Sequence, residues 1–450
     1  MAIDAVREIA LKALYDINEK GAYSNITLDK YLEGHELREV DRAFITELVY
    51  GTLKWKLAID WIIGQFSSIK LKKISPWILN TLRLGVYQIL YTDRIPDSAA
   101  CNESVALAKR YGHEASGRYV NAVLRNVSRS KGNINYPDKQ KELEKYLSVK
   151  YSHPEWMVGE WLKRFGGEFT ESLLDSNNTV PDFTIRVNTL KVSKRELAKR
   201  LEALGMETAE GKFAEEAMII KKPVSISNLD AFKEGLFQIQ DESSMLVAKV
   251  LDPKPGELAI DVCSAPGGKS THIAQLMNNI GTVLARDIHE HKIRLIEDAA
   301  SRLGITIIKA ELFDAAEVDD NFLEKADRVL VDAPCTGLGI IRRKPDIKWA
   351  RNMGDKKEIT CLQGKILNAS AKYVKPGGVL VYSTCTIEKE ENEDIVRAFI
   401  EKEKDFTFED ISGLLPIGLK KSSATFGYIQ LYPNLDGIDG FFICRMRRRG

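Results

Sequence analysis

The 450-residue sequence lacks several features that would place it in common protein classes. Its six cysteines are scattered, without the close spacing of a zinc site or a disulfide framework. No apolar run approaches the roughly 20 residues that a membrane-spanning helix needs. The first residues include acids and show no cleavage site, so they do not resemble an export signal. We therefore expect a cytoplasmic protein with no membrane span and no metal site.

The sequence also lacks a charge excess, internal repeats and low-complexity tracts. Lys and Arg number 65 and Asp and Glu number 64, which gives a net charge of +1 at pH 7. Any affinity for nucleic acid must then come from local basic faces rather than from the overall charge. With 44% hydrophobic and 29% charged residues, a chain of this length suits two to four domains with well-filled cores.

Three kinds of pattern follow one another along the chain. Residues 1–135 show helical periodicity, as in "SPWILNTLRLGVYQILY", where Ser75-Pro76 marks a helix start. The polar stretch 129–140 is typical of a linker, and residues 141–235 mix helices with strands such as "FTIRVNTL" and "AMIIKKP". From 236 to 450, short β-branched runs alternate with helical segments. We predict an all-α domain, a small α+β domain and a doubly wound α/β domain whose ligands lie beyond the carboxyl ends of parallel strands.

The stretch "DVCSAPGGKST", residues 261–271, follows the first of these parallel strands and suggests a nucleotide-binding loop. A phosphate-binding loop of the type Gly-x-x-x-x-Gly-Lys-Ser/Thr would need glycine at position 263, which is Cys263. The other interpretation is a Rossmann-like loop in which Gly267 and Gly268 let the backbone approach a nucleoside closely. The residues that we expect to bind this ligand are Cys263, Ser264, Ala265, Pro266, Gly267, Gly268 and Lys269.

Acidic residues follow the next three strands. Asp287 lies 19 residues after Gly268, a spacing typical of a carboxylate that accepts hydrogen bonds from ribose. Asp314 could reach the adenine edge, and Asp332 ends the fourth strand. Each acid alone could equally be a helix cap or a turn residue. Three of them beside a glycine loop favour an adenosine compound without a polyphosphate as the ligand.

Two cysteines lie in turns that follow strands. The stretches "VLVDAPCTGLG" and "VLVYSTCT" contain Cys335 and Cys385. A lone cysteine beside apolar strands is most often an inert buried thiol, and we interpret Cys101, Cys361 and Cys444 in that way. Cys335 and Cys385 differ because both lie on the side of the predicted sheet where ligands bind.

Together, "DVCSAPGGKS", "VDAPCTGLGIIRRKPDIKW" and "YSTCTIEKEENE" resemble the motifs of the cytosine-5 RNA methyltransferases that use S-adenosylmethionine. The stretches "FQIQDESSMLVAKVL" and "DGFFICRMRR" resemble the flanking motifs of that family, and the helical N-terminal domain resembles the antitermination protein NusB. This combination is similar to the Sun/Fmu type, which modifies 16S ribosomal RNA, and the likeness covers nearly the whole chain. Ser264, Leu338 and Thr386 vary within the motifs, and Ala299 stands where relatives often have Asn.

The resemblance implies a Rossmann-like class I methyltransferase domain, S-adenosylmethionine as the cofactor and a covalent mechanism. Cys385 would add to carbon 6 of cytosine, which makes carbon 5 nucleophilic, and Cys335 would assist product release. Asp332, which is also expected near the cofactor, would hydrogen-bond the amino edge of the base. Lys269 is a candidate cation that would favour a thiolate. The alternative gives Cys335 the attacking role, which the cysteine of the Pro-Cys turn has in DNA cytosine methyltransferases.

Two basic clusters are candidates for binding RNA, which we expect to be unassembled or partly assembled 16S ribosomal RNA. Arg118, Arg125 and Arg129 recur at helical spacing, although such a run is often only a solvated helix face. The second cluster, directly after the Pro-Cys turn, is Arg342, Arg343 and Lys344. The target cytosine must leave its stack to react, which favours a loop or partly unfolded RNA.

Other interpretations stay open. The same chemistry could act on transfer RNA or on another ribosomal site, and a non-catalytic assembly factor could keep the fold without the activity. The NusB-like domain disfavours the first, and the intact glycine loop with both cysteines disfavours the second. Arg186 and Asn188, in "IRVNTL", lie in a family motif, but the sequence assigns them no role. We expect the protein to act as a monomer.

Overall fold

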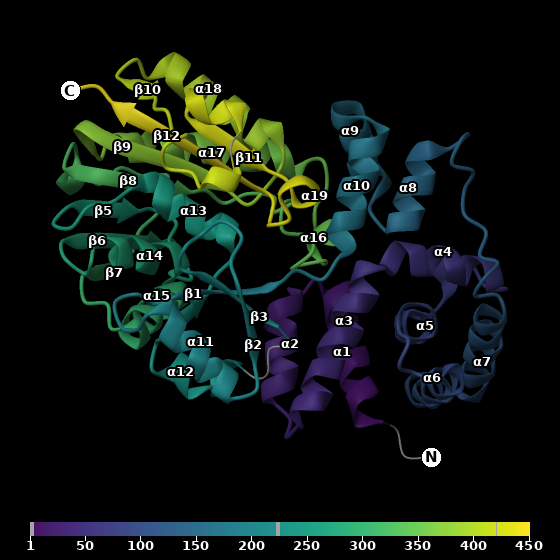
Figure 1. Ribbon diagram of the computed structural model, residues 1–450. Coiled ribbons are helices and arrows are strands. Elements are labelled where there is room, and N and C mark those ends of the chain that lie inside the picture. Colours follow the sequence, from purple (N-terminus) through teal and green to yellow (C-terminus); the bar gives the residue numbers. More distant parts are fainter. Residues whose placement is uncertain (1–3, 222–225, 420) are drawn as a thin grey trace. The chain divides into compact units, whose positions relative to one another are not determined.

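The computed structural model describes residues 4–221, 226–419 and 421–450, which form two compact units (Figure 1). The first unit contains the chain up to Thr179 together with Ile341–Arg351. The second contains Val180–Ile340 and Asn352–Gly450. Among the described residues, no helix is both long and apolar enough to cross a membrane.

The regular elements described in the first unit are all helical, as predicted for the N-terminal part of the chain. Helix α5 begins at Pro76. The N–H of a first helical residue has no partner within the helix, so proline loses no hydrogen bond at this position. The helices of this unit are α1 (Ala5–Lys20), α2 (Ser24–Glu33), α3 (Glu39–Lys54), α4 (Lys56–Phe66), α5 (Pro76–Tyr91), α6 (Asp97–Tyr111), α7 (Glu114–Arg129), α8 (Leu143–Tyr151), α9 (Glu155–Phe165), α10 (Gly167–Asn178) and the short α16 (Ile347–Ala350). The boundaries predicted at 1–135, 141–235 and 236–450 stay a prediction, since α8 to α10 group with the N-terminal helices in this division.

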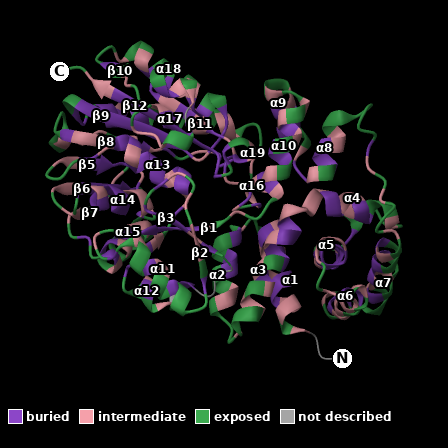
Figure 2. Cartoon of the chain, in the orientation of Figure 1, coloured by how far each residue is buried: buried purple, intermediate pink, exposed green. Residues whose placement is uncertain are grey.

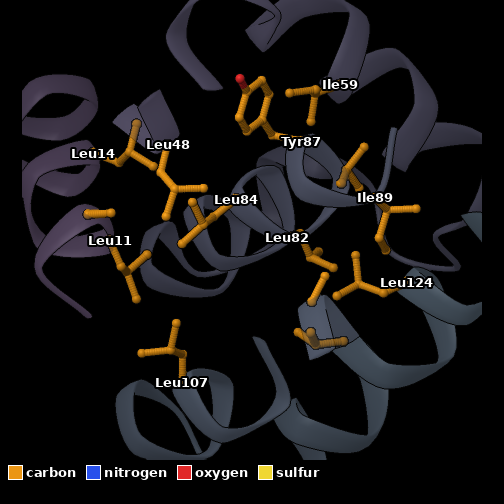
Figure 3. Close-up of a cluster of buried hydrophobic side chains, with 14 of the residues drawn as sticks. Leu11, Leu14, Leu48, Ile59, Leu82, Leu84, Tyr87, Ile89, Leu107 and Leu124 are labelled. Carbon is orange, nitrogen blue, oxygen red and sulfur yellow. The ribbon is translucent and has the colours of Figure 1, made fainter. Parts of the chain in front are cut away.

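The core of the first unit is built around α5. Leucine and isoleucine side chains from α1, α3, α4, α6 and α7 converge on it (Figure 3), and the inward sides of these helices are buried (Figure 2). Each fully buried leucine contributes roughly 1.5–3 kcal/mol to stability. Helix α3 approaches α5 so closely that a Cβ atom on Gly51 would lie 2.0 Å from Cζ of Tyr87. Only glycine fits at this crossing without a shift of the tyrosine ring.

The segment Ile341–Arg351 packs into the first unit, although it begins six residues after Cys335 in the sequence. The side chain of Lys348 is 0% exposed and donates hydrogen bonds to the carbonyl oxygens of Lys54 (2.8 Å) and Ser152 (2.7 Å). Burial lowers the pKa of Lys348 well below its ordinary value. The indole N–H of Trp349 donates to a carbonyl oxygen of α3. The segment is therefore an integral part of the helical unit.

The second unit contains a small antiparallel sheet with strand order β2-β3-β1-β4. Its predicted strand "FTIRVNTL" and the helix that begins after Ser193 are confirmed, and Ser193 accepts a hydrogen bond from the backbone N–H of Glu196. The predicted strand "AMIIKKP" is confirmed up to Lys221, and its last two residues lie outside the described residues. The elements are β1 (Phe183–Val187), α11 (Lys194–Ala203), β2 (Glu207–Glu210), β3 (Ala217–Lys221), α12 (Asp230–Lys233) and β4 (Phe237–Ile239).

The second unit also contains the predicted doubly wound sheet, with strand order β7-β6-β5-β8-β9-β12-β10 and β11 paired to β12. Strands β5 to β9 are parallel, and the strands after them pair antiparallel, which the sequence did not predict. The strands are β5 (Leu258–Asp261), β6 (Thr282–Asp287), β7 (Ile308–Leu312), β8 (Ala326–Asp332), β9 (Val374–Thr384), β10 (Phe406–Phe408), β11 (Tyr428–Leu431) and β12 (Phe441–Arg448). The helices are α13 (Glu242–Leu251), α14 (Gly268–Leu276), α15 (Glu290–Leu303), α17 (Asp355–Ala371), α18 (Glu393–Lys402) and α19 (Pro433–Asp436).

Helices cover both faces of this sheet, and successive strand residues pack on opposite sides. Val379 and Val381 of β9 belong to a core shared with α13 and α14, whereas Leu380 and Tyr382 belong to a core shared with α17 and α18. From β5 the chain adds β6 and β7 on one side and then β8 and β9 on the other. The carboxyl ends of β5 and β8 therefore flank a topological switch point, where ligands bind in open α/β sheets.

The crossing of α3 and α5 gives a stability prediction. We expect Gly51→Ala to lower the free energy of unfolding by about 1–2 kcal/mol, because overpacking against Tyr87 outweighs the better helix propensity of alanine. Gly64→Ala is the matched control, since Gly64 is exposed within α4 and an added Cβ meets no atom within 4 Å. This control should gain about 0.5–1 kcal/mol. Urea unfolding of the full chain, followed by circular dichroism, measures both, and equal effects of the two substitutions would contradict the close approach.

Candidate functional site

The glycine loop connects β5 to α14 and lies at the switch point. Gly267 has a φ of +96°, in the left-handed region, and a Cβ there would lie 3.2 Å from the backbone Cα of Ile296. Only glycine adopts this conformation without strain. A Cβ on Gly268 would point into open space, so the glycine leaves room at the start of the helix. Both observations fit a loop that a nucleoside ligand approaches closely.

Hydrogen bonds made by Ser264 and Thr271 hold this loop in place. The backbone N–H and the hydroxyl of Ser264 both donate to the carbonyl oxygen of Arg286, at 2.8 and 3.0 Å. The hydroxyl of Thr271 donates to the carbonyl oxygen of Gly267 at 2.8 Å. The loop is therefore tied to β6 on one side and to its own helix on the other.

Asp261, at the end of β5, is a site residue that the sequence reasoning missed. Its side chain is fully buried and accepts a hydrogen bond from the hydroxyl of Ser270 at 2.6 Å, and its Oδ1 atom has no partner in the described part of the chain. Burial raises the pKa of this carboxyl to about 7. An acidic residue at the end of an apolar strand, inside the quoted glycine motif, was the signal that could have identified it.

Arg186, whose role the sequence does not predict, binds the glycine loop. The guanidinium is 1% exposed and donates to the carbonyl oxygen of Gly268 at 2.7 Å and to the hydroxyl of Thr271 at 3.0 Å. It also donates to the side-chain oxygen of Gln240. Arg186 therefore connects the small sheet directly to the first turn of α14.

Asn188 has a structural role close to this connection. Its side-chain amide donates to the carbonyl oxygens of Gly235 (2.8 Å) and Leu303 (2.9 Å). These bonds link the end of β1 to the end of α15. The motif "IRVNTL" thus fixes the small sheet against the large one in two places.

The acids after β6 and β7 lie at the predicted strand ends, and both make local hydrogen bonds. Asp287 is buried and accepts from the backbone N–H of His289 at 3.1 Å, and Lys292 lies 3.6 Å from the same oxygen. Asp314 is exposed and accepts from the backbone N–H of Ala316 at 2.9 Å. Both acids thus take part in turns, as the alternative interpretation expected. Their contact with a ligand stays a prediction.

Asp332 joins the two sides of the switch point. One carboxylate oxygen lies 2.7 Å from Nζ of Lys269, and the other accepts a hydrogen bond from the hydroxyl of Ser383 at 2.8 Å. Burial lowers the pKa of Lys269, but the charge and hydrogen bond of Asp332, together with the charges of Cys385 and Asp261, outweigh burial. The pKa is therefore raised overall and the ammonium is retained. Asp332, Lys269 and Ser383 therefore form a single charged cluster at the ends of β5, β8 and β9.

Cys335 and Cys385 come together beside this cluster. Their sulfur atoms lie 3.2 Å apart, which is a contact between two thiols and not the roughly 2.05 Å of a disulfide. The hydrogen bond with Cys385 and burial raise the pKa of Cys335 well above its ordinary value. Lys269 interacts electrostatically with Cys385. The surroundings therefore keep the proton on Cys335, and the cation of Lys269 acts on Cys385.

The turn that carries Cys335 lies against the turn that carries Cys385. The backbone N–H of Gly339 donates to the carbonyl oxygen of Cys385 at 3.0 Å, and the N–H of Gly440 donates to the carbonyl oxygen of Gly339 at 2.9 Å. A Cβ on Gly339 would lie 2.0 Å from the carbonyl oxygen of Gly440. The motif "DGFFICRMRR" thus supports the turn of Cys335 through a contact that only glycine permits.

The two basic clusters differ in exposure. Arg118, Arg125 and Arg129 are exposed on the outer face of α7, opposite its buried residues. Of the second cluster, Arg342 is 8% exposed, Arg343 is half-buried and Lys344 is exposed. A role in binding RNA stays a prediction for all six residues.

Three family models match consecutive parts of the chain. The model described as "16S rRNA methyltransferase RsmB/F" matches residues 248–447. The NusB family matches residues 4–129, and a ferredoxin-like domain of RsmF/B-like methyltransferases matches residues 153–227. A Bacillus subtilis protein named "Probable ribosomal RNA small subunit methyltransferase B" is 43% identical over 99% of both chains.

Solved structures are similar as well. The crystal structure of PH0851 is 29% identical, with a TM-score of 0.83 over 100% of both chains. The crystal structure of NSun6 from Pyrococcus horikoshii with SFG, an analogue of S-adenosylmethionine, is 26% identical, with a TM-score of 0.59 over 66% of this chain and 98% of that one. The predicted fold class is confirmed, and so is S-adenosylmethionine as the cofactor.

The hydrogen bonds of Arg186 predict an effect on cofactor binding. We expect Arg186→Ala to raise the Kd for S-adenosylmethionine about tenfold, equivalent to ~1.4 kcal/mol, because the loop loses charged hydrogen bonds at Gly268 and Thr271. Isothermal titration calorimetry measures this Kd. Arg302→Ala is the matched control, since Arg302 donates to carbonyl oxygens of Phe232 and Phe237 and not to the loop. Equal weakening by both variants would show that Arg186 acts only on general stability.

Proposed function

Because the chain belongs to the family of ribosomal RNA small subunit methyltransferase B, which methylates 16S ribosomal RNA with S-adenosylmethionine, we propose that it methylates carbon 5 of one cytosine through a covalent bond between Cys385 and carbon 6. The observation that carries this proposal is the distance of 3.2 Å between the sulfur atoms of Cys335 and Cys385 beside the pair of Lys269 and Asp332.

The glycine loop fits the cofactor. When bound, S-adenosylmethionine supplies an electrophilic methyl group. The open space at Gly268 and the left-handed Gly267 form a cradle with room for a nucleoside carrying an amino acid. The buried carboxylate of Asp261 binds Ser270 in the helix that follows this loop. Asp287 would accept hydrogen bonds from the ribose, and Asp314 would lie at the adenine edge. The residues proposed to line the cradle are Cys263, Ser264, Ala265, Pro266, Gly267, Gly268, Lys269 and Asp332.

The reaction begins with the Cys385 thiolate. Its Sγ atom adds to carbon 6 of cytosine, and the electron pair of the ring double bond moves toward carbon 5. Carbon 5 then becomes nucleophilic enough to accept the methyl group. Asp332 is proposed to accept a hydrogen bond from the amino group of the base, which holds the ring in place and polarises it. Ser383 and Lys269 orient this carboxylate.

Release of the product requires a solvent water to take the proton from carbon 5. The electron pair of that C–H bond re-forms the ring double bond as the bond between Sγ of Cys385 and carbon 6 breaks. A protonated Cys335 can donate a hydrogen bond to Sγ of Cys385 as this sulfur leaves with the electron pair. Its raised pKa keeps the proton available for that purpose. The interaction of Lys269 with Cys385 supports Cys385, rather than Cys335, as the nucleophile.

Trapping with 5-fluorocytosine RNA tests the assignment. No base can remove fluorine from carbon 5 as a cation in the way that it removes the proton, so the adduct persists. We expect Cys385→Ser to abolish the adduct and to lower kcat by several orders of magnitude. Cys335→Ser should still form an adduct but release product slowly. Denaturing gels and mass spectrometry of the adduct peptide distinguish the two. If Cys335→Ser loses the adduct while Cys385→Ser keeps it, the roles are reversed.

The RNA is proposed to be unassembled or partly assembled 16S ribosomal RNA, bound by a cytoplasmic monomer. Access of Cys385 to carbon 6 requires the base to leave its stack, which a finished duplex opposes. The exposed face of α7 is proposed to contact phosphates through Arg118, Arg125 and Arg129. Arg342, Arg343 and Lys344 are proposed to contact the strand near the target base.

The α7 face predicts a change in salt dependence. Replacing Arg118, Arg125 and Arg129 by Gln should weaken RNA binding at low salt and reduce the slope of log K against log salt by about one for each phosphate that is no longer neutralised. Lys131→Gln is the control, because Lys131 already forms an ion pair with Asp97 at 2.7 Å. Filter binding across a salt series measures the slope. An unchanged slope in the triple variant would remove α7 from the RNA-binding surface.

A further inference from the structure

Two adjacent residues of the motif "YSTCTIEKEENE", Glu391 and Asn392, have no part in the chemistry described above, yet both are buried. Glu391 lies in a short 3-10 turn after β9, and Asn392 precedes α18. A buried carboxylate is costly unless hydrogen bonds compensate for its lost hydration. The partners of these two side chains therefore indicate what they do.

Glu391 holds the turn that carries Cys335. One carboxylate oxygen accepts from the backbone N–H of Thr336 at 2.9 Å and from the amide of Gln363 at 3.0 Å. The other accepts from the hydroxyl of Thr336 at 2.5 Å. The same amide of Gln363 donates to the carbonyl oxygen of Pro334 at 3.0 Å. Both neighbours of Cys335 are thus fixed through Glu391 and its partner.

Asn392 holds the turn that carries Cys385 in the same way. Its side-chain oxygen accepts from the hydroxyl of Thr384 at 2.5 Å, and its amide donates to the carbonyl oxygen of Thr386 at 3.1 Å. Both neighbours of Cys385 are thus fixed by one side chain. The amide also donates to the side-chain oxygen of Gln430 at 2.7 Å, which restricts its rotation.

The two turns are also linked to each other. The hydroxyl oxygens of Thr336 and Thr386 lie 2.9 Å apart. Because Thr336 gives its proton to Glu391, Thr386 is the donor of this bond. Two consecutive residues, Glu391 and Asn392, thus position the residues on both sides of both cysteines, with Pro334 positioned through Gln363.

We propose that Glu391 and Asn392 are positioning residues that set the spacing between the sulfur atoms of Cys335 and Cys385. The catalytic meaning of this spacing rests on the proposed function. The spacing itself is a property of the two turns and can be measured separately. Within the ranges that the structure describes, neither side chain bonds the glycine loop, so the cofactor site should not depend on them.

The rate of disulfide formation between the two thiols reports their spacing. With diamide as the oxidant, the thiols lose two protons and two electrons, which diamide takes up, and one bond forms between the sulfur atoms. We expect Glu391→Ala and Asn392→Ala to slow this step and to lower kcat for methyl transfer by about 100-fold, the effect of a displacement near 1 Å. The Kd for S-adenosylmethionine should remain unchanged. Peptide mass spectrometry identifies the disulfide.

Milder variants keep the test decisive if an alanine variant fails to fold. Glu391→Gln keeps an oxygen for the N–H of Thr336 and should retain most of the oxidation rate and of kcat. Thr336→Val removes only the hydroxyl and should slow both. Glu390→Gln is the control, because its carboxylate is half-exposed and lies 3.8 Å from Lys356.

Three outcomes would overturn the inference. One is a folded Glu391→Ala or Asn392→Ala variant that oxidises and turns over like the wild type. Another is a parallel loss of cofactor affinity, which would indicate a general structural role. The third is a Thr336→Val variant that behaves like the control. Slow oxidation with an unchanged kcat would instead keep the spacing role and show that methyl transfer does not depend on it. A wild type that forms no 5-fluorocytosine adduct would contradict the proposed function and leave the spacing role standing.

Discussion

The pair of Lys269 and Asp332 is the interaction on which the arrangement of the site depends. It joins the loop after β5 to the end of β8, so it fixes the proposed cofactor loop relative to the strand end that leads to Cys335. Both side chains are largely shielded from water, and removing one partner would leave the other charge poorly hydrated. The parallel pairing of β8 with β9 places Asp332 opposite Ser383, so the end of β9 lies beside the end of β8. Cys335 lies three residues after Asp332, and Cys385 lies two residues after Ser383.

The two cysteines have identical side chains but different charged neighbours. Two sulfur atoms 3.2 Å apart cannot both ionise without strong repulsion, so one proton is retained by the pair. The neighbours decide which thiol keeps it. Asp332 and Glu391 add negative charge around Cys335, while Lys269 acts on Cys385. This charge placement supports the proposed roles of Cys385 as nucleophile and of Cys335 as proton donor.

The sequence predicted the features that follow from strand order. The glycine loop, the acids after successive strands and the two cysteine turns all lie at carboxyl ends of parallel strands, so recognising the strands places them together. Arg186 and Asp261 were missed or left without a role because their importance depends on tertiary contacts. Arg186 lies in a different sheet from the loop it binds, and no periodicity connects β1 with Gly268. The antiparallel strands β10 to β12 were missed because alternation of strands and helices predicts only the parallel part of a sheet.

The segment after Cys335 shows that residues adjacent in the sequence do not always share a role. Arg342, Arg343 and Lys344 follow the turn directly, and a basic run beside a reactive cysteine suggests contact with a phosphate backbone. The chain there belongs to the helical unit, where Lys348 is buried against two carbonyl oxygens and Arg342 is also largely buried. A buried lysine costs hydration energy, which its two hydrogen bonds only partly recover. Lys348 therefore anchors this segment in the helical unit. Each basic residue of the segment has to be assigned separately, either to anchoring or to the proposed RNA binding.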